Sequence, residues 1–253
     1  MKYALISDIH ANLPALQAVL EDIQAQHCTN SACLGDIVGN NAQPKECLDI
    51  IRGMRIPCVK GNYDEHCSDF NSLDNLNPKA AAMIKWTIQQ LTTEDSVWLY
   101  ELPYILTIAG FTIVHAMMSE PHRWEYVFDK LAAARSFAEQ KTSVCFFGHT
   151  HIPMAFVRDS TFHGGTYSKF RIEAGKQYFV NVGSVGQPRD GIPKAAYTIY
   201  DLEEKTVELR RVAFENPPGD SGSAAVPSDP YSPKPNPLDT SQSKINQNRP
   251  DYK

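Results

Sequence analysis

The chain opens with Lys2-Tyr-Ala-Leu-Ile-Ser7, a short apolar run that leads directly into Asp8-Ile9-His10. The run predicts a β-strand, and Pro14 then begins a helical pattern with its apolar residues on one face. The same order of strand and helix continues along the first third of the chain, with further elements at 31–34, at 44–51 and at 56–59. This alternation favours a parallel sheet built from right-handed crossovers.

The remaining elements indicate a larger α/β domain. Helical patterns run over 78–91 and 129–140, and the apolar runs 104–108 and 111–115 predict a hairpin around Ala109-Gly110. Further strands are predicted at 144–147, 154–157, 178–182, 196–202 and 207–212. We expect the last three of these strands to form a second, more antiparallel sheet.

The composition divides the chain after Phe214. The 253 residues are 42% hydrophobic and 21% charged, which suits one compact domain with an appendage. From residue 216 onward the sequence is rich in Pro, Ser, Asn and Asp and has few large aliphatic residues, so it cannot bury enough apolar area to offset its ordering entropy. We therefore predict a folded domain over 1–215 and a disordered tail over 216–253.

Charge and hydropathy exclude several classes of protein. The net charge is −5 and the pI about 5.9, so the basic footprint of a dedicated nucleic-acid surface is absent. No apolar stretch approaches ~18 residues, and no signal peptide precedes the first strand, which argues against a membrane partner. The 6 cysteines show no Cys-x-x-Cys spacing and are expected to be buried thiols. We expect a cytoplasmic protein.

Polar side chains suited to metal binding follow several predicted strands. The candidates lie in Asp8-Ile9-His10, Gly35-Asp36, Gly61-Asn62-Tyr63-Asp64, His115 and Gly148-His149-Thr150-His151. Sites in open α/β sheets form at the carboxyl ends of strands, so these clusters can converge at one edge. Divalent manganese and iron ions can be coordinated by carboxylate, imidazole and amide-oxygen ligands together. One shared carboxylate can hold two ions ~3.5–4 Å apart, a spacing that suits displacement at phosphorus.

This order of motifs resembles the calcineurin-like metallophosphoesterase superfamily. The segment Asn181-Val-Gly-Ser-Val-Gly-Gln-Pro-Arg189 is similar to the loop that closes the domain in its small bacterial and archaeal phosphodiesterase branch. The resemblance spans residues 2 to about 214 and implies a four-layer α/β/β/α sandwich of two mixed sheets.

The resemblance also implies a metal-ligand set. One ion would be held by Asp8, His10 and His151, and the other by Asn62, His115 and His149. Asp36 would bridge both ions together with a hydroxide. Asp36, Asn62 and His149 are accordingly the expected catalytic residues.

Two departures from the family bear on the substrate and on the acid. The protein-phosphatase branch has an Asp-Arg pair after its Gly-Asp motif, whereas here Ile37-Val38-Gly39-Asn40 follows Asp36. Many members also place a general-acid histidine after the Asn, where this chain has Tyr63. A phenol is protonated at neutral pH, although a pKa of about 10 matches that pH poorly. Tyr63 is the first candidate acid and His66 the second, and His66 is more simply a loop residue.

Three further side chains are candidates for the rim of the site. His122 and Arg123 follow Pro121 and can line the substrate cleft. Arg189 ends the closing loop, and its guanidinium suits either a phosphate contact or a structural salt bridge.

The function that the sequence favours is a dinuclear metal-dependent phosphoesterase that hydrolyses phosphodiesters with a metal-bridging hydroxide. The expected cofactors are two divalent ions, manganese in the first place, with iron, nickel or zinc as options. Two such ions bring about four positive charges, and Asp8, Asp36 and a hydroxide remove about three, which suits a singly charged diester. The expected partner is a small phosphate-ester or nucleotide substrate, and the sequence leaves a homo-oligomer open.

Two alternatives remain. Within enzymes, the chain suits a phosphomonoesterase or a dinucleoside polyphosphate hydrolase, which a substrate panel would separate. In another class, vacuolar sorting subunits of similar fold carry altered metal sites and serve as protein-binding scaffolds. Every expected ligand is present here, and bound metal in the purified protein would discriminate.

Removal of residues 216–253 tests the predicted tail. We expect the melting temperature and the activity to stay almost unchanged, because the segment has little apolar area to bury. Thermal melts and steady-state kinetics of full-length and truncated protein measure this. A melting temperature lower by several degrees, or a shifted Michaelis constant, would show instead that Tyr231, Leu238 or Ile245 docks onto the domain.

Overall fold

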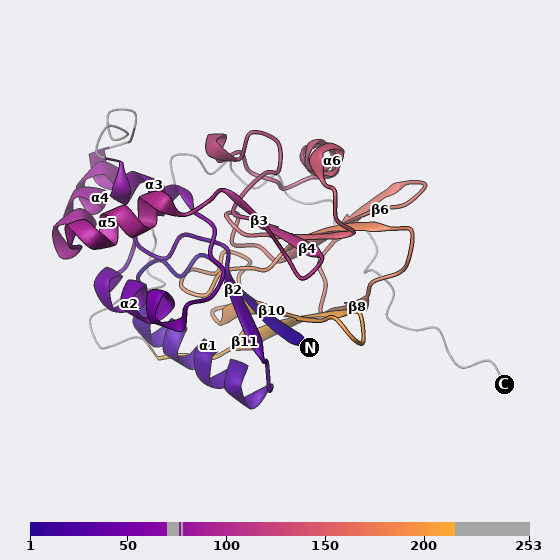
Figure 1. Ribbon diagram of the computed structural model, residues 1–253, viewed down its shortest axis with the longest axis horizontal. Coiled ribbons are helices and arrows are strands. Elements are labelled where there is room, and N and C mark those ends of the chain that lie inside the picture. Colours follow the sequence, from indigo (N-terminus) through magenta and orange to yellow (C-terminus); the bar gives the residue numbers. More distant parts are fainter. Residues whose placement is uncertain (70–75, 77, 216–253) are drawn as a thin grey trace.

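The computed structural model describes residues 1–69, 76 and 78–215, which form two β-sheets with helices on both outer sides (Figure 1). The predicted tail over 216–253 lies outside this part of the chain. In spatial order, the five-stranded sheet contains β2 (Asn30–Cys33), β1 (Lys2–Ile6), β10 (Ala195–Asp201), β11 (Thr206–Val212) and β8 (Lys169–Arg171). The six-stranded sheet contains β3 (Ile105–Ile108), β4 (Phe111–Val114), β5 (Val144–Phe147), β9 (Gln177–Asn181), β6 (Met154–Arg158) and β7 (Phe162–Gly165).

The helices lie outside these sheets and at one end of them. The structure contains α1 (Leu13–Ala25), α2 (Pro44–Met54), α3 (Asn62–Ser68), α4 (Pro78–Gln90), α5 (Thr93–Glu101), the 3₁₀ turn η1 (Pro121–Arg123) and α6 (Lys130–Glu139). In Figure 1, α1 and α6 lie on opposite sides of the strands, and α3, α4 and α5 form a group at one end. Each helix in the described ranges is too short or too polar to cross a lipid bilayer.

Three layers of apolar side chains hold these elements together. Along β1, Ala4 and Ile6 pack with the helical cluster that includes Leu16, whereas Tyr3 and Leu5 face the other sheet. This alternation is the period of a strand buried on both faces. A third cluster packs α6 against the outer face of the six-stranded sheet. The order helix, sheet, sheet, helix confirms the expected α/β/β/α sandwich.

The predicted grouping of the last three strands was wrong. β9 lies in the six-stranded sheet, parallel to β5 and antiparallel to β6. β10 pairs antiparallel with β1 and with β11, so these strands extend the first sheet, which is mixed rather than purely parallel. The alternation of apolar residues identifies a strand and its buried faces, but it does not specify the neighbouring strand.

The segment 56–59 is not a strand of either sheet. It makes a single parallel bridge, between Cys58 and Cys33, although the Val59 N–H donates to the Cys33 carbonyl at 3.0 Å. Pro57 has no N–H to donate, so the ladder cannot extend.

Sequence patterns also missed α3, α5, η1, β7 and β8. The sequence analysis predicts no helix at Asn62, and α3 has only 7 residues. A signal for α5 was present, because the Thr92 side chain accepts the N–H of Asp95 while the Asp95 carboxylate accepts the N–H of Thr92. This reciprocal capping is a recognised start of a helix.

Two glycines allow close contact between the loop after β2 and the start of α3. Gly35 has a φ of 92°, and a Cβ built on it would lie 2.4 Å from the backbone nitrogen of Gly61. A Cβ on Gly61 would lie 2.2 Å from Asp36 Oδ1 and 2.3 Å from the Asp36 backbone nitrogen. Because backbone atoms lie in the way, neither position tolerates a side chain without displacement of a loop.

Gly61→Ala tests this contact, with Gly53→Ala in α2 as the matched control. We expect Gly61→Ala to lower the free energy of unfolding by about 1–3 kcal/mol or more, because the new methyl group overlaps the backbone of Asp36. A Cβ on Gly53 meets nothing within 4 Å. Gly53→Ala should therefore raise the free energy of unfolding by about 0.5–1 kcal/mol, the helix preference of alanine. Urea titrations measure both, and equal stabilities of the two variants would contradict the packing argument.

Candidate metal centre

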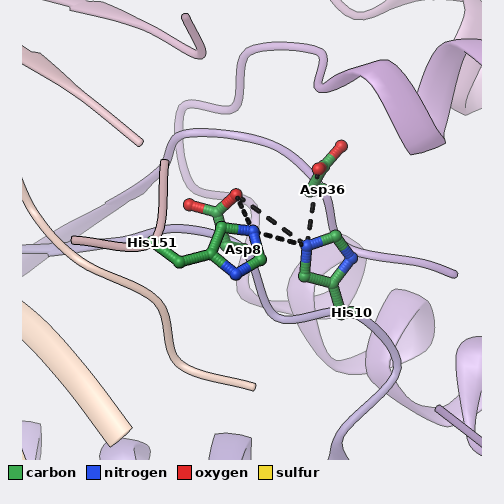
Figure 2. Close-up of side chains that lie close together, drawn as sticks. All are labelled: Asp8, His10, Asp36 and His151. Carbon is green, nitrogen blue, oxygen red and sulfur yellow. Dashed lines mark hydrogen bonds and ion pairs between the residues drawn. The ribbon is translucent and has the colours of Figure 1, made fainter. Parts of the chain in front are cut away.

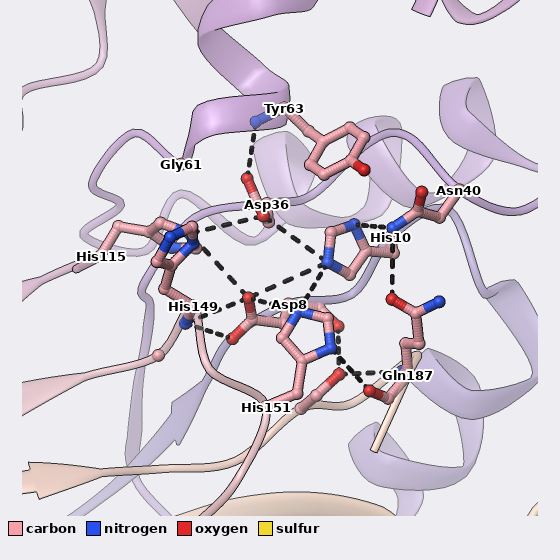
Figure 3. Close-up of polar contacts among 12 residues, drawn as sticks. Asp8, His10, Asp36, Asn40, Gly61, Tyr63, His115, His149, His151 and Gln187 are labelled. Atoms are coloured by element: carbon pink, nitrogen blue, oxygen red, sulfur yellow. Dashed lines mark hydrogen bonds and ion pairs between the residues drawn. The ribbon is translucent and has the colours of Figure 1, made fainter. Parts of the chain in front are cut away.

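The candidate ligands converge where strands of both sheets end (Figure 3). Asp8 and His10 follow β1, Asp36 follows β2, His115 follows β4, and His149 and His151 follow β5. Asn62 is the first residue of α3. The structure therefore places all the expected ligand residues at one end of the sandwich, and two carboxylates and four imidazoles there are buried.

Backbone conformation turns these ligands inward. The φ angles of Asp8, His10, Asp36, His149 and His151 are 54°, 48°, 52°, 65° and 60°. This left-handed region costs a non-glycine residue roughly 1–3 kcal/mol and recurs at functional sites. Hydrogen bonds between the loops maintain it: the Asp8 N–H donates to the Gly35 carbonyl at 3.0 Å, and the His10 N–H donates to the Asp36 carbonyl at 2.9 Å.

Asp8, His10, Asp36 and His151 form what we call the first cluster (Figure 2). Each offers one ligand atom, and these atoms lie within 4.8 Å of one another. His151 Nε2 is 3.2 Å from Asp8 Oδ1, and His10 Nε2 is 3.5 Å from Asp36 Oδ2. The two Nε2 atoms are 3.0 Å apart, so both imidazoles point at the same small volume.

Asp36, His115 and His149 form the second cluster, so Asp36 belongs to both. His115 Nε2 lies 3.4 Å from Asp36 Oδ2. Within the described part of the chain, neither His115 Nε2 nor Asn62 Oδ1 has a hydrogen-bond partner, although both atoms are buried. Buried polar atoms normally have a partner, and a nitrogen and an oxygen left open beside a shared carboxylate fit a metal ion.

Backbone carbonyls determine which nitrogen of three imidazoles faces the clusters. His115 Nδ1 donates to the Leu34 carbonyl at 2.7 Å, and His151 Nδ1 donates to the Gln187 carbonyl at 2.6 Å. His149 Nε2 donates to the Trp124 carbonyl at 2.8 Å. A carbonyl can only accept, so in each neutral imidazole the other nitrogen keeps its lone pair. Such outer contacts are typical of metal-binding histidines.

His10 is oriented by side chains instead. Its Nδ1 lies 3.1 Å from Asn40 Nδ2, which also donates to Gln187 Oε1 at 3.3 Å. Arg189 Nη2 donates to the same Gln187 oxygen at 3.1 Å, which places the candidate phosphate contact beside the first cluster. Asn40 and Gln187 were not identified as site residues from the sequence.

The two buried carboxylates and the neighbouring imidazoles shift one another's pKa values. Burial alone would raise the pKa of the Asp8 and Asp36 carboxyls, but the nearby imidazoles outweigh it and lower the pKa of Asp36 to about 2. Burial lowers the pKa of His10 to about 3 and that of His149 to about 4. For His115, the attraction of Asp36 exceeds the effect of burial and raises the pKa to about 9. The pocket therefore carries anionic carboxylates that attract cations.

Asp64 joins the two ligand loops without facing either cluster. Its carboxylate accepts the backbone N–H groups of Asp36, Ile37 and Gly61 at 2.8, 2.9 and 3.0 Å. Burial and the charge of Asp36 raise its pKa to about 7. The sequence motif contains Asp64, but its structural role becomes visible only from these three bonds.

The two candidate acids, Tyr63 and His66, differ in how well they suit proton donation to a leaving group. The Tyr63 N–H donates to Asp36 Oδ1 at 2.8 Å, and the Tyr63 ring meets that of His10 edge-on at 5.0 Å. His66 is half-buried on α3, and burial lowers its pKa, so it is mostly unprotonated at neutral pH and poorly suited to donate a proton. His122 and Arg123 lie exposed in η1.

Comparisons with known proteins identify the family of this chain. A family model described as calcineurin-like phosphoesterase superfamily domain matches residues 1–205. An uncharacterised protein of Methanocaldococcus jannaschii is 39% identical over 219 residues, 84% of this chain and 87% of its own length.

Two solved structures share the fold of this chain. A metallophosphoesterase from Sphaerobacter thermophilus superposes with a TM-score of 0.73 at 36% identity, over 85% of this chain and 89% of that one. A hypothetical protein from Pyrococcus horikoshii shares the fold, with a TM-score of 0.70 at 20% identity and the same coverage. The motifs, the sandwich and the matched family together show that this chain belongs to the calcineurin-like phosphoesterase superfamily.

Proposed function

We propose that the chain is a two-metal phosphoesterase that prefers phosphodiesters. The family is metal-dependent and hydrolyses phosphoric esters. The observation that carries the proposal is the membership of Asp36 in both ligand clusters. One carboxylate with a cluster on each side is the arrangement that two adjacent ions require.

The ligands divide between two ions. Asp8, His10 and His151 would hold one ion, Asn62, His115 and His149 would hold the other, and Asp36 would serve both. Carboxylate, imidazole and amide oxygen together suit manganese, with iron, nickel or zinc as alternatives. When bound, such ions supply Lewis acidity and activate water.

The residues of the chain prepare this chemistry by their orientation. Carbonyl acceptors select the tautomer of His115, His149 and His151, so in each neutral imidazole the nitrogen that faces the clusters has the lone pair. Because the pKa of His115 is raised to about 9, this imidazole would give up its proton when an ion binds. Burial lowers the pKa of His149, so its Nδ1, opposite the bond to the Trp124 carbonyl, keeps its lone pair at neutral pH. Burial also lowers the pKa of His10, so this imidazole is uncharged at neutral pH. Tyr63 is our candidate for protonating the leaving group, because α3 holds its ring against His10 at the cluster.

The residue at position 40, beside the first cluster, supports a diester substrate. At the point where the protein-phosphatase branch has a phosphate-clamping arginine, this chain has the neutral Asn40. The Asn40 amide is engaged with His10 and Gln187. A dianionic monoester gains most from an additional cation, whereas a singly charged diester requires less. We propose a small phosphate ester or nucleotide as the substrate.

Cysteine chemistry supports a cytoplasmic setting, which we also propose. All 6 cysteines are free and 5 of them are buried. Free thiols are typical of a reducing compartment.

Manganese loading and a substrate panel test the proposed function. We expect about two Mn²⁺ per chain and faster hydrolysis of bis(4-nitrophenyl) phosphate than of 4-nitrophenyl phosphate. Asp36→Asn should reduce the metal content below one ion and lower turnover by more than about 100-fold, because both ions lose a shared ligand. Asp49→Asn replaces an exposed carboxylate on α2 and should leave metal content and turnover unchanged.

Each alternative corresponds to a distinct result. One ion or fewer per chain in the unaltered protein would contradict the two-metal proposal. Faster hydrolysis of the monoester would contradict the diester preference. Two bound ions without turnover of any phosphate ester would favour the scaffold class.

A further inference from the structure

Trp124 contacts both imidazoles of the second cluster. Its backbone carbonyl accepts the hydrogen bond from His149 Nε2 at 2.8 Å. Its indole ring meets the His115 ring edge-on, with centroids 5.7 Å apart and an interplanar angle of 73°. One residue outside all the metal-binding motifs therefore contacts two of the expected ligands of one ion.

The segment around Trp124 also covers the face of His149. Tyr126 stacks on that imidazole with ring centroids 4.2 Å apart and an interplanar angle of 13°. The His149 ring is thus fixed along its edge by the Trp124 carbonyl and across its face by Tyr126. Rotation of the ring away from the second cluster requires the segment to move.

The conformation of Trp124 needs support from elsewhere. Its φ is 54°, in the left-handed region, directly after η1. A bulky residue is strained in this region and adopts this conformation only where neighbouring contacts stabilise it. The neighbouring side chains of His122 and Arg123 are exposed, so η1 itself offers little packing.

Glu65 provides a charged anchor for Trp124. The indole Nε1 donates to Glu65 Oε2 at 2.8 Å, and the Tyr104 hydroxyl donates to Glu65 Oε1. The ring centroids of Tyr104 and Trp124 are 5.7 Å apart. Hydrogen bonds to an ionised carboxylate are stronger than neutral ones, and this carboxylate lies on α3, the helix that begins with Asn62.

We propose that Glu65 is a positioning residue for the second metal ion: through Trp124 it holds His149 and His115 in place, and α3 supplies both this anchor and the ligand Asn62. This inference rests on the proposed two-metal function. Glu65 contacts neither ion nor substrate. It acts through the orientation of two imidazoles, so its loss should affect the second ion and spare the first.

Calorimetric titration with Mn²⁺ tests the inference. For Glu65→Ala we expect the dissociation constant of one ion to rise about 10-fold or more and that of the other to stay within about twofold, as for other outer contacts of metal ligands. Glu65→Gln should restore most of the affinity, because its amide oxygen accepts from the indole and its amide nitrogen donates to the Tyr104 hydroxyl. Glu101→Ala, which removes an exposed carboxylate from α5, is the control and should bind like the unaltered protein.

A second variant covers the case in which Glu65→Ala does not fold. Trp124→Phe removes the indole N–H but keeps an aromatic ring and the carbonyl, and it should weaken the same single ion. Circular dichroism confirms that each variant is folded before titration.

The outcomes separate this inference from the proposed function. Two ions bound with unchanged affinity by folded Glu65→Ala, or equal weakening of both ions, would overturn the positioning role alone. A single ion in the unaltered protein would overturn the two-metal proposal and this inference with it. Selective weakening that Gln reverses would support both.

Discussion

Two buried carboxylates determine how the rest of this structure is arranged. Asp8 and Asp36 are almost completely inaccessible to solvent, and charged groups in such a position are unfavourable unless cations and hydrogen bonds surround them. The His149 N–H donates to Asp8 Oδ2 at 3.0 Å, which ties the end of β5 in one sheet to the end of β1 in the other. The sheets therefore pack so that the imidazoles from β4 and β5 meet the carboxylates from β1 and β2.

The elements of the fold were more predictable from the sequence than their order in space. Apolar alternation identified most strands of the sandwich within one or two residues, because burial of a face leaves a periodic pattern. It did not indicate that β9 lies beside β5 while β10 lies beside β1, since any strand with suitable faces can pair with either. Short helices such as α3 were missed because local polar contacts, and not an apolar face, define them.

In the candidate site, too, some residues could be predicted from the sequence and others could not. Asp36, His115 and His149 could be selected because carboxylates and imidazoles after strands are uncommon and chemically distinctive. Trp124 and Gln187 could not, because each orients an imidazole through a backbone carbonyl that every residue possesses. The left-handed backbone at the ligands was equally unpredictable, since tertiary hydrogen bonds impose it on residues that do not favour it.

The ligands and some of the residues that orient them lie on different segments, and this separation bears on how such sites diversify. The ligands stand at strand ends, and the loop hydrogen bonds of Asp64 keep Asp36 and Asn62 in a constant relation. Two of the residues that orient the imidazoles lie on separate segments that carry no ligand, Trp124 after η1 and Gln187 after β9. Substitutions in these segments can alter the affinity for one ion, or the shape of the rim, while the strands and the ligands remain intact. Differences in metal and substrate among proteins with the same ligands are therefore to be sought in the segments that orient them, and not in the motifs themselves.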